Sequence, residues 1–200
     1  MRKIVVIAMI SLDGVMQAPG GPKEDTSGGF KLGGWTWPYA DEFSRKIFDE
    51  EFSLDYDLLL GKKTYNIWRN YWPKQKGTIA DPFNKATKYV VSDVDTKLSW
   101  EKSVLIDGDV PGKIKKLKQE NGPMLYVQGS SNMIQTLLKH DLVDELWLRI
   151  YPVTLGKGKR LFGEGAIPAA YEMTKSAISP KGIIFAYYKR AGEVKTGSFE

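Results

Sequence analysis

The chain has 200 residues, 42% of them hydrophobic and 26% charged, and a formal net charge of +5. This composition is that of an ordinary folded domain with its own core, and it excludes a long disordered or strongly basic protein. With no cysteine and a single histidine, His140, disulfides, thiolate zinc sites and cysteine nucleophiles are excluded and a histidine-rich metal site is impossible. We expect no metal centre.

The first predicted element is a strand over residues 3–10, a continuous apolar run typical of a strand buried on both faces of a parallel sheet. Because the run ends by Ile10, it is too short for a signal peptide or a membrane span, so we expect a cytoplasmic protein without membrane contact. About two dozen residues rich in Gly and Pro follow Gly14. Such a long loop is usually functional, and its aromatic residues argue against disorder.

Helices and strands then alternate. Apolar residues at helical spacing, N-cap acids and turn glycines mark the helices, and short apolar β-rich runs mark the strands. The expected elements are a helix over 40–53, a strand over 56–60, a helix over 62–71, strands over 88–92 and 103–106, a helix over 109–122, a strand over 124–128 and a helix over 130–140.

From residue 144 onward, strands follow one another. Residues 144–151 alternate between apolar and other side chains, and residues 171–179 and 182–190 flank a turn at Pro180-Lys181-Gly182, which predicts an antiparallel hairpin. This order predicts one α/β domain over residues 1–190, with a mainly parallel central sheet, helices on both faces and a C-terminal antiparallel hairpin. Residues 191–200 form a polar tail.

Two strand-to-helix turns carry residues that suit a phosphate group. In each, an apolar strand stops at a glycine, Gly61 or Gly129, and a helix begins within two residues. Such a turn directs free backbone N–H groups and the positive end of the helix dipole into one space. Two of these turns in a small α/β chain predict a ligand with more than one phosphate, such as a dinucleotide.

Several stretches stand in the order found in a known superfamily: Val5 to Gly14, Leu60 to Thr64, Tyr89 to Ser92, Val127 to Ser130, Asp144 to Gly158, and Phe185 to Tyr188. Over about residues 2–190 the chain resembles the dihydrofolate-reductase-like superfamily. It is most similar to the reductase domain of the bifunctional deaminase-reductase of riboflavin biosynthesis and its stand-alone relatives, a branch set apart by Pro152 to Gly158. The resemblance implies a three-layer fold that binds NADPH across the carboxyl ends of the strands.

The resemblance also implies residue roles at the cofactor. Ile7 and Ala8 would lie beneath the nicotinamide, Thr64 would bond the pyrophosphate, and Lys62 would meet the 2′-phosphate. The full set of expected cofactor residues is Ile7, Ala8, Gly61, Lys62, Thr64, Ser92, Gly129, Ser130, Ser131 and Asn132. Plain strand-core, surface and helix-capping roles remain open for the same residues. Asp93, beside Ser92, would repel a 2′-phosphate or shift the preference toward NADH.

Candidate substrate residues lie in the loop and the first helix. By resemblance, Asp13 ranks first for orienting the substrate or supplying a proton, although an Asx turn is an equal alternative. Trp35 and Trp37 either stack on a flat ring or form a hydrophobic lid. True dihydrofolate reductases carry an acid on the first helix that protonates the pterin, and here Glu42 or Asp41 is the nearest candidate. The alternative is that these acids only complement the dipole at the start of the helix.

The sequence as a whole therefore predicts a reductase that transfers hydride from NADPH to a small planar heterocycle, pterin-like or of the aminopyrimidine type. A catalytically weak NADP(H)-binding module or sensor is the alternative. A nucleic-acid-binding protein is disfavoured because the densest lysine group, Lys113 to Lys118, has the spacing of a solvated helix face. The resemblance implies pairing through residues 144–158, so we expect a homodimer in which the exposed side chains of Trp147 and Tyr151 lie on the covered surface.

Overall fold

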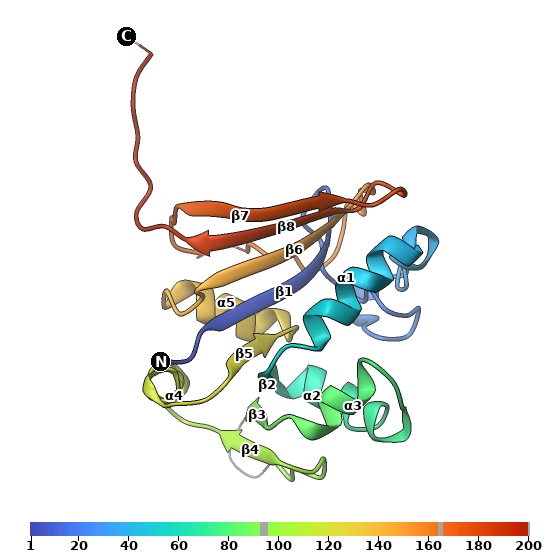
Figure 1. Ribbon diagram of the computed structural model, residues 1–200, viewed down its shortest axis with the longest axis vertical. Coiled ribbons are helices and arrows are strands. Elements are labelled where there is room, and N and C mark those ends of the chain that lie inside the picture. The colour runs from blue at the N-terminus through green and yellow to red at the C-terminus, as the bar shows by residue number, and fades with distance from the viewer. Residues whose placement is uncertain (93–95, 164–165, 200) are drawn as a thin grey trace.

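The computed structural model describes residues 1–92, 96–163 and 166–199. Within these ranges eight strands form one sheet, in the order β4-β3-β2-β5-β1-β6-β8-β7 (Figure 1). The strands are β1 (Ile4–Ser11), β2 (Tyr56–Gly61), β3 (Lys88–Val91), β4 (Ser103–Ile106), β5 (Met124–Val127), β6 (Glu145–Tyr151), β7 (Tyr171–Ile178) and β8 (Ile184–Arg190).

The α-helices of the described residues are α1 (Glu42–Phe52), α2 (Lys62–Trp68), α3 (Ala80–Lys85), α4 (Val110–Gln119) and α5 (Ser131–Lys139). The six strands from β4 to β6 run parallel, whereas β8 runs antiparallel to both β6 and β7. The predicted mainly parallel sheet with a C-terminal antiparallel hairpin is therefore confirmed. No helix in the described ranges is both long and apolar enough to cross a membrane.

Helices cover both faces of the sheet, and the alternation of side chains along β1 shows how. Val6 and Ala8 belong to the core cluster that α4 and α5 complete, whereas Val5 and Ile7 belong to the cluster that α1, α2 and α3 complete. Successive strand residues point to opposite faces, so a strand in the middle of a three-layer domain must be apolar throughout. That requirement accounts for the unbroken apolar run at the start of the chain.

The long loop after β1 packs against the β6–β8 end of the sheet. Its buried residues Val15, Phe30 and Trp35 share a core cluster with Tyr151 and Phe185. The Trp35 indole meets the Tyr151 ring edge-on, with 5.3 Å between centroids, and its N–H donates to the carbonyl of Gln17 at 2.8 Å. Phe30 and Trp35 therefore form part of the core and hold a Gly-rich and Pro-rich segment against the sheet.

Two helices differ from the sequence prediction. The helix expected over 62–71 ends at Trp68, and the chain then enters a 3-10 turn at Trp72–Lys74. The helix α3 was not predicted, because six residues with Pro82 in the first turn are too short to show a helical period. Its buried Phe83 packs against Phe52 and Trp68 of the preceding helices, with ring centroids 5.3 and 4.9 Å away.

The expectation that Trp147 and Tyr151 of β6 are exposed on the single chain is wrong. Arg149 and Tyr151 are 1% and 3% exposed, and Trp147 is half-buried against Tyr126 and Tyr187. The physical reason is that β6 lies between β1 and β8, with α1 and the long loop packed over the face that carries Trp147 and Tyr151. Trp147 and Tyr151 thus contribute to the core of this chain.

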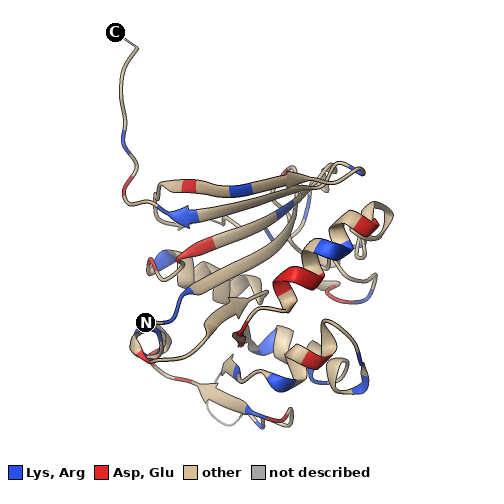
Figure 2. Ribbon diagram, in the orientation of Figure 1, with Lys and Arg blue, Asp and Glu red and all other residues tan. Residues whose placement is uncertain are grey.

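Charged residues are interspersed along the ribbon, with Lys and Arg beside Asp and Glu on helices and strands alike (Figure 2). Several neighbours of opposite charge form ion pairs, such as Lys113 with Asp107 and Arg45 with Asp49. After β8, residues 191–199 extend away from the sheet without a helix or strand (Figure 1).

The packing of α5 yields a stability prediction. Leu137 of α5 is fully buried against the sheet. Leu137→Ala should lower the free energy of unfolding by about 2–5 kcal/mol, because it removes buried methyl groups and leaves a cavity. Leu32→Ala, at a residue that is 51% exposed, should change it by no more than about 0.5 kcal/mol. Urea denaturation measures both, and equal effects would contradict this description of the core.

Candidate functional site

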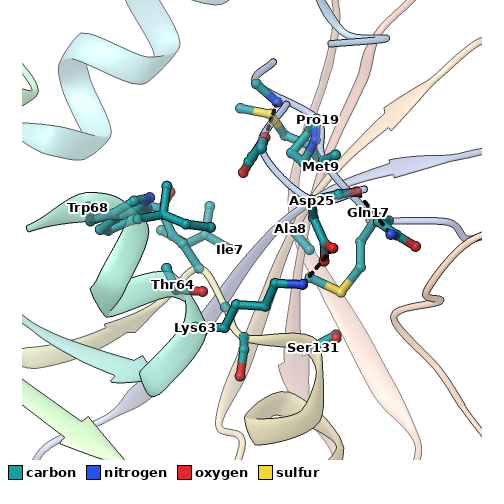
Figure 3. Close-up of a pocket in the computed structure, with 18 of the residues that line it drawn as sticks. Ile7, Ala8, Met9, Gln17, Pro19, Asp25, Lys63, Thr64, Trp68 and Ser131 are labelled. Carbon is teal, nitrogen blue, oxygen red and sulfur yellow. Dashed lines mark hydrogen bonds and ion pairs between the residues drawn. The ribbon is translucent and has the colours of Figure 1, made fainter. Parts of the chain in front are cut away.

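A cavity of about 260 Å³ opens where β2 and β5 end, over the second half of β1 and beneath the long loop (Figure 3). Ile7, Ala8 and Met9 of β1 form its floor. The remaining lining comes from the loop (Met16 to Gly20, Glu24, Asp25), α1 (Phe48, Phe52), α2 and the turn after it (Lys63, Thr64, Ile67, Trp68, Trp72), the turn after β5 (Gln128 to Ser131), Arg149 and Lys159.

The two phosphate-suited turns touch one another, because β2 and β5 are neighbours in the sheet. The Gly61 N–H donates to the Gly129 carbonyl at 3.1 Å. A Cβ on Gly61 would collide with the Ser130 hydroxyl, and a Cβ on Gly129 would lie 2.5 Å from Thr64 Oγ1. Gly129 also has a φ of +146°, which a residue with a side chain rarely adopts. Both positions therefore require glycine.

A second, more open hollow of about 820 Å³ lies beyond this contact, over the ends of β2 and β3. Lys62, Ser92 and Asn132 line it, and so do Lys63 and Ser130, which also line the first cavity. The two hollows thus meet at the glycine turns. Two spaces joined at a rim of backbone N–H groups and hydroxyls can accept an elongated ligand with an anionic middle and a group at each end.

The structure brings together all ten residues expected at the cofactor. Ile7, Ala8, Thr64, Gly129 and Ser131 line the first cavity, Gly61, Lys62, Ser92 and Asn132 line the second hollow, and Ser130 lines both. The Ser130 side chain makes no capping hydrogen bond to the first turn of α5. Its hydroxyl lies instead against Gly61. Asp93, also singled out by the sequence, lies outside the described residues.

An ion cluster ties the long loop across the cavity. Asp25 accepts a hydrogen bond from Lys63 of α2 at 2.5 Å (Figure 3). It accepts a second one from Lys159 at 2.7 Å. Burial opposes the charge on Asp25, but the hydrogen bonds from Lys159, Lys63 and Ser27 outweigh it and hold the pKa of this carboxyl well below its ordinary value. Asp25 is therefore a fixed anion that bridges two elements.

Glu24 is the second carboxyl group of the cavity wall, and sequence reasoning missed it. Burial raises the pKa of Glu24, and the hydrogen bond from the Gly20 N–H at 2.7 Å only partly offsets this effect. A carboxyl group with a raised pKa keeps its proton to higher pH and can act as a general acid. No sequence pattern indicated this role, because Glu24 lies in an irregular loop.

Asp13, ranked first from the sequence, is not in the cavity wall. Its carboxylate accepts from the Ser11 hydroxyl at 2.6 Å and from the backbone N–H groups of Leu155 and Gly156 at 3.0 and 2.8 Å. These hydrogen bonds lower the pKa of Asp13 to about 2. A carboxyl group that is ionised at neutral pH and occupied by three donors does not supply a proton. The N–H of Val15, two residues on, donates to the Ser11 hydroxyl, so Asp13 joins the start of the loop to Leu155 and Gly156 and does not form the expected Asx turn.

The other expected substrate residues also lie away from the cavity wall. Trp35 of the loop is buried in the core, and Trp37 is 70% exposed and donates its N–H to the Gly20 carbonyl. Glu42 is exposed and paired with Lys46 on the next turn of α1. Asp41 caps α1 through the Ser44 N–H at 2.7 Å. These acids stabilise the helix, and the tryptophans stabilise the loop.

The cavity instead takes its aromatic wall from the facing sides of α1 and α2. Phe48 and Phe52 come from α1, and Trp68 from α2. The sequence shows the Phe48–Phe52 pair only as a helix stripe, since i, i+4 spacing is equally typical of core packing. These rings and the apolar floor suit a flat, unsaturated molecule. Among the described residues no group of three or more metal-ligating side chains is present.

Comparison with known proteins identifies the relatives of this arrangement. The model of the RibD C-terminal domain family matches residues 2–185. Two uncharacterized Bacillus subtilis (strain 168) proteins are similar: YyaP is 26% identical over 136 residues, 66% of this chain and 72% of that protein, and YwjB is 28% identical over 163 residues, 82% of this chain and 84% of that protein.

Solved structures share the fold. A putative riboflavin biosynthesis protein from Shewanella sp. PV-4 has a TM-score of 0.70 at 22% identity, covering 94% of this chain and 99% of that one. A pyrimidine reductase-like protein from Corynebacterium diphtheriae scores 0.64 at 15% identity (96% and 93% covered). Dihydrofolate reductase from Enterococcus faecalis, complexed with NADP(H), scores 0.59 at 15% identity (94% and 96% covered). The fold is thus dihydrofolate-reductase-like.

The environment of Asp13 yields a pH prediction. A lowered pKa means that ionised Asp13 stabilises the fold above its ordinary pKa near 4, and that this contribution is lost as the pH falls toward 2. Asp13→Asn should lower the free energy of unfolding by roughly 1–2 kcal/mol at pH 7. The difference from the wild type should shrink between pH 4 and pH 2 in urea denaturation. A difference independent of pH would show that ionisation of Asp13 has no such role.

Proposed function

The chain belongs to the RibD C-terminal domain family, and from this premise we propose that it is an NADPH-dependent reductase acting on a small planar heterocycle. The observation that carries the proposal is the junction of two hollows at Gly61 and Gly129, where both turns exclude any side chain. A dinucleotide has the matching shape, with a pyrophosphate between two ring-bearing halves. The Enterococcus dihydrofolate reductase of the same fold was solved with NADP(H), which supports this assignment.

The residues at the junction fit such a cofactor. Backbone N–H groups at the start of α5, with the hydroxyls of Thr64 and Ser131, would hold the pyrophosphate. Lys62, in the second hollow, would meet the 2′-phosphate as a point charge. Ile7 and Ala8 would support the nicotinamide from the floor of the first cavity. NADPH, when bound, supplies a hydride.

The proton that completes the reduction has a candidate source in Glu24. It lines the first cavity, its pKa is raised by burial, and no described cation is paired with its carboxyl group in the way that Lys63 and Lys159 are paired with Asp25. A protonated carboxyl beside the substrate can donate to the atom that receives electron density during hydride transfer. Phe48, Phe52 and Trp68 exclude water and hold the flat ring.

A titration tests the cofactor assignment. NADPH should bind the wild-type protein more tightly than NADH, and Lys62→Ala should weaken NADPH binding about tenfold with little effect on NADH, because a charge-assisted contact to the 2′-phosphate is lost. Lys115→Ala, on the exposed side of α4, is the matched control. Calorimetry gives the dissociation constants. Failure to bind either dinucleotide would overturn the proposal, whereas binding without turnover of any pterin or pyrimidine would favour the catalytically weak module.

The pH dependence of turnover tests Glu24. Because the protonated form is the active one, the rate of NADPH oxidation should fall as the pH rises through the raised pKa of Glu24. Glu24→Gln should reduce kcat about 100-fold and remove this limb of the profile. Glu42→Gln, at the exposed acid of α1, should leave the profile unchanged. A Glu24→Gln profile that keeps the wild-type limb would assign the proton to another group.

A further inference from the structure

The ion cluster that ties the long loop across the cavity contains two cations and one paired carboxylate. Asp25 pairs with Lys63 at 2.5 Å and with Lys159 at 2.7 Å, and Ser27 adds hydrogen bonds from its N–H and its hydroxyl at 3.1 and 2.6 Å. Both ion pairs described for the two lysines end on this one carboxylate. One lysine balances one aspartate, so the cluster carries one positive charge in excess.

The two lysines are held in different ways. The backbone N–H of Lys159 donates to the Gln17 side chain at 3.0 Å, and Gln17 is 4% exposed and itself donates to the carbonyls of Asp25 and Ser27 at 3.0 and 2.9 Å. Lys159 and Asp25 are therefore joined twice, once by charge and once through Gln17. Lys63 comes from α2, and its side chain, 45% exposed, reaches the loop only through its ammonium group.

Lys63 lies where the two hollows meet. Among the described basic residues that line the hollows, only Lys63 lines both. Figure 3 shows its side chain reaching from α2 to Asp25 of the loop. A lysine ammonium is a point charge on a flexible four-carbon stem, so it can turn from Asp25 to an anion at the junction without movement of the backbone. Lys159 and Ser27 then stay on Asp25, and its carboxylate is not left unpaired.

We infer that Lys63 moves from Asp25 to the diphosphate group when a dinucleotide binds, an inference that rests on the proposed function. Asp25 then competes with the diphosphate for one cation. The exchange removes one of the two ion pairs that hold this part of the loop, so the loop segment around Asp25, Glu24 included, responds to the occupancy of the junction. Cofactor binding and the position of the loop are coupled by this one side chain.

Dissociation constants of Lys63 variants separate this residue from Lys62. Lys63→Met should weaken the binding of NADPH and of NADH about tenfold each, because both carry the same diphosphate and both lose a charge-assisted contact. Lys62→Ala should weaken the binding of NADPH alone. Lys63→Arg should restore most of the affinity for both dinucleotides. A Lys63→Met protein that binds both dinucleotides as the wild type does would overturn the inference.

A double-mutant cycle tests the competition. Asp25→Asn should tighten the binding of both dinucleotides about fivefold, because it removes the charge that holds Lys63. In the Lys63→Met background the same substitution should have almost no effect, since competition needs both partners. Asp141→Asn, which breaks the ion pair with Arg190 and lines neither hollow, is the control for the change in net charge. An Asp25→Asn effect of equal size in both backgrounds, or none in either, would overturn the competition.

A label on the loop tests the coupling. Because the chain has no cysteine, Lys23→Cys at an exposed loop residue introduces a single thiol for a fluorophore. Saturating NADH should change the fluorescence of the labelled protein, and adding Lys63→Met should abolish most of that change, because the loop has then lost the ion pair before the ligand arrives. No change in the labelled protein, or an undiminished change with Lys63→Met, would overturn the coupling.

Inorganic pyrophosphate separates the failure of this inference from the failure of the proposed function. It should bind the wild-type protein and bind the Lys63→Met protein several-fold more weakly. Dinucleotides that bind the wild type and Lys63→Met equally well would leave the reductase assignment standing and overturn the transfer of Lys63. Pyrophosphate binding that depends on Lys63, with no binding of either dinucleotide, would overturn the cofactor assignment and leave Lys63 as a diphosphate-binding residue.

Discussion

The contact between Gly61 and Gly129 is the constraint on which the site depends. Strands β2 and β5 run parallel as neighbours, so the turns that leave them meet at one edge of the sheet. The two backbones are joined by a hydrogen bond of 3.1 Å, and a Cβ on either glycine would collide with the side chain of Ser130 or Thr64. Because Ser130 and Thr64 fill the remaining space, the turns position the starts of α5 and α2 together. The two hollows join there for that reason.

A second set of contacts holds the long loop in place, in which two aspartate carboxylates bond groups outside the loop. Asp13 fastens the start of the loop to Leu155 and Gly156, and Asp25 fastens its middle to Lys63 and Lys159. Each carboxylate accepts several hydrogen bonds, which stabilise its ionised form and lower its pKa. Glu24 lacks this saturation, which is why burial raises its pKa and leaves it the carboxyl group of the cavity most suited to carry a proton.

The sequence pattern predicted those parts of the fold in which the pattern is compatible with only one structure. The unbroken apolar run of β1 requires a strand covered on both faces, and glycines at 61 and 129 after such strands indicate turns at a common edge. Alternation in β6 was ambiguous. Arg149 has the spacing of a solvent-facing residue, and only the long-range packing of α1 and the loop, together with the charge of Glu51, makes it a buried one.

Site residues were predictable to the extent that backbone geometry defines them. The glycine turns require particular residue types, so they can be recognised in the sequence. Asp13, Trp35 and Glu42 were chosen by their positions along the chain. In the structure Asp13 bonds the backbone of residue 155, Trp35 is a core residue and Glu42 forms a surface ion pair. Glu24 lies in an irregular loop, where spacing carries no information about which side chain faces a cavity. Such residues are identified only by their contacts.

The ion pair beneath the cavity shows how the fold holds a positive group next to an apolar wall. An isolated arginine at 1% exposure would be strongly disfavoured, and burial indeed lowers the pKa of Arg149 to about 10. Glu51 compensates the charge from the side away from the cavity, and the Tyr187 hydroxyl occupies the second carboxylate oxygen. These contacts fix the orientation of the guanidinium group, whose Nε–H has no hydrogen-bond partner among the described residues. A stability requirement alone would be met by an apolar residue of similar volume, so stability does not by itself account for a buried arginine at this position.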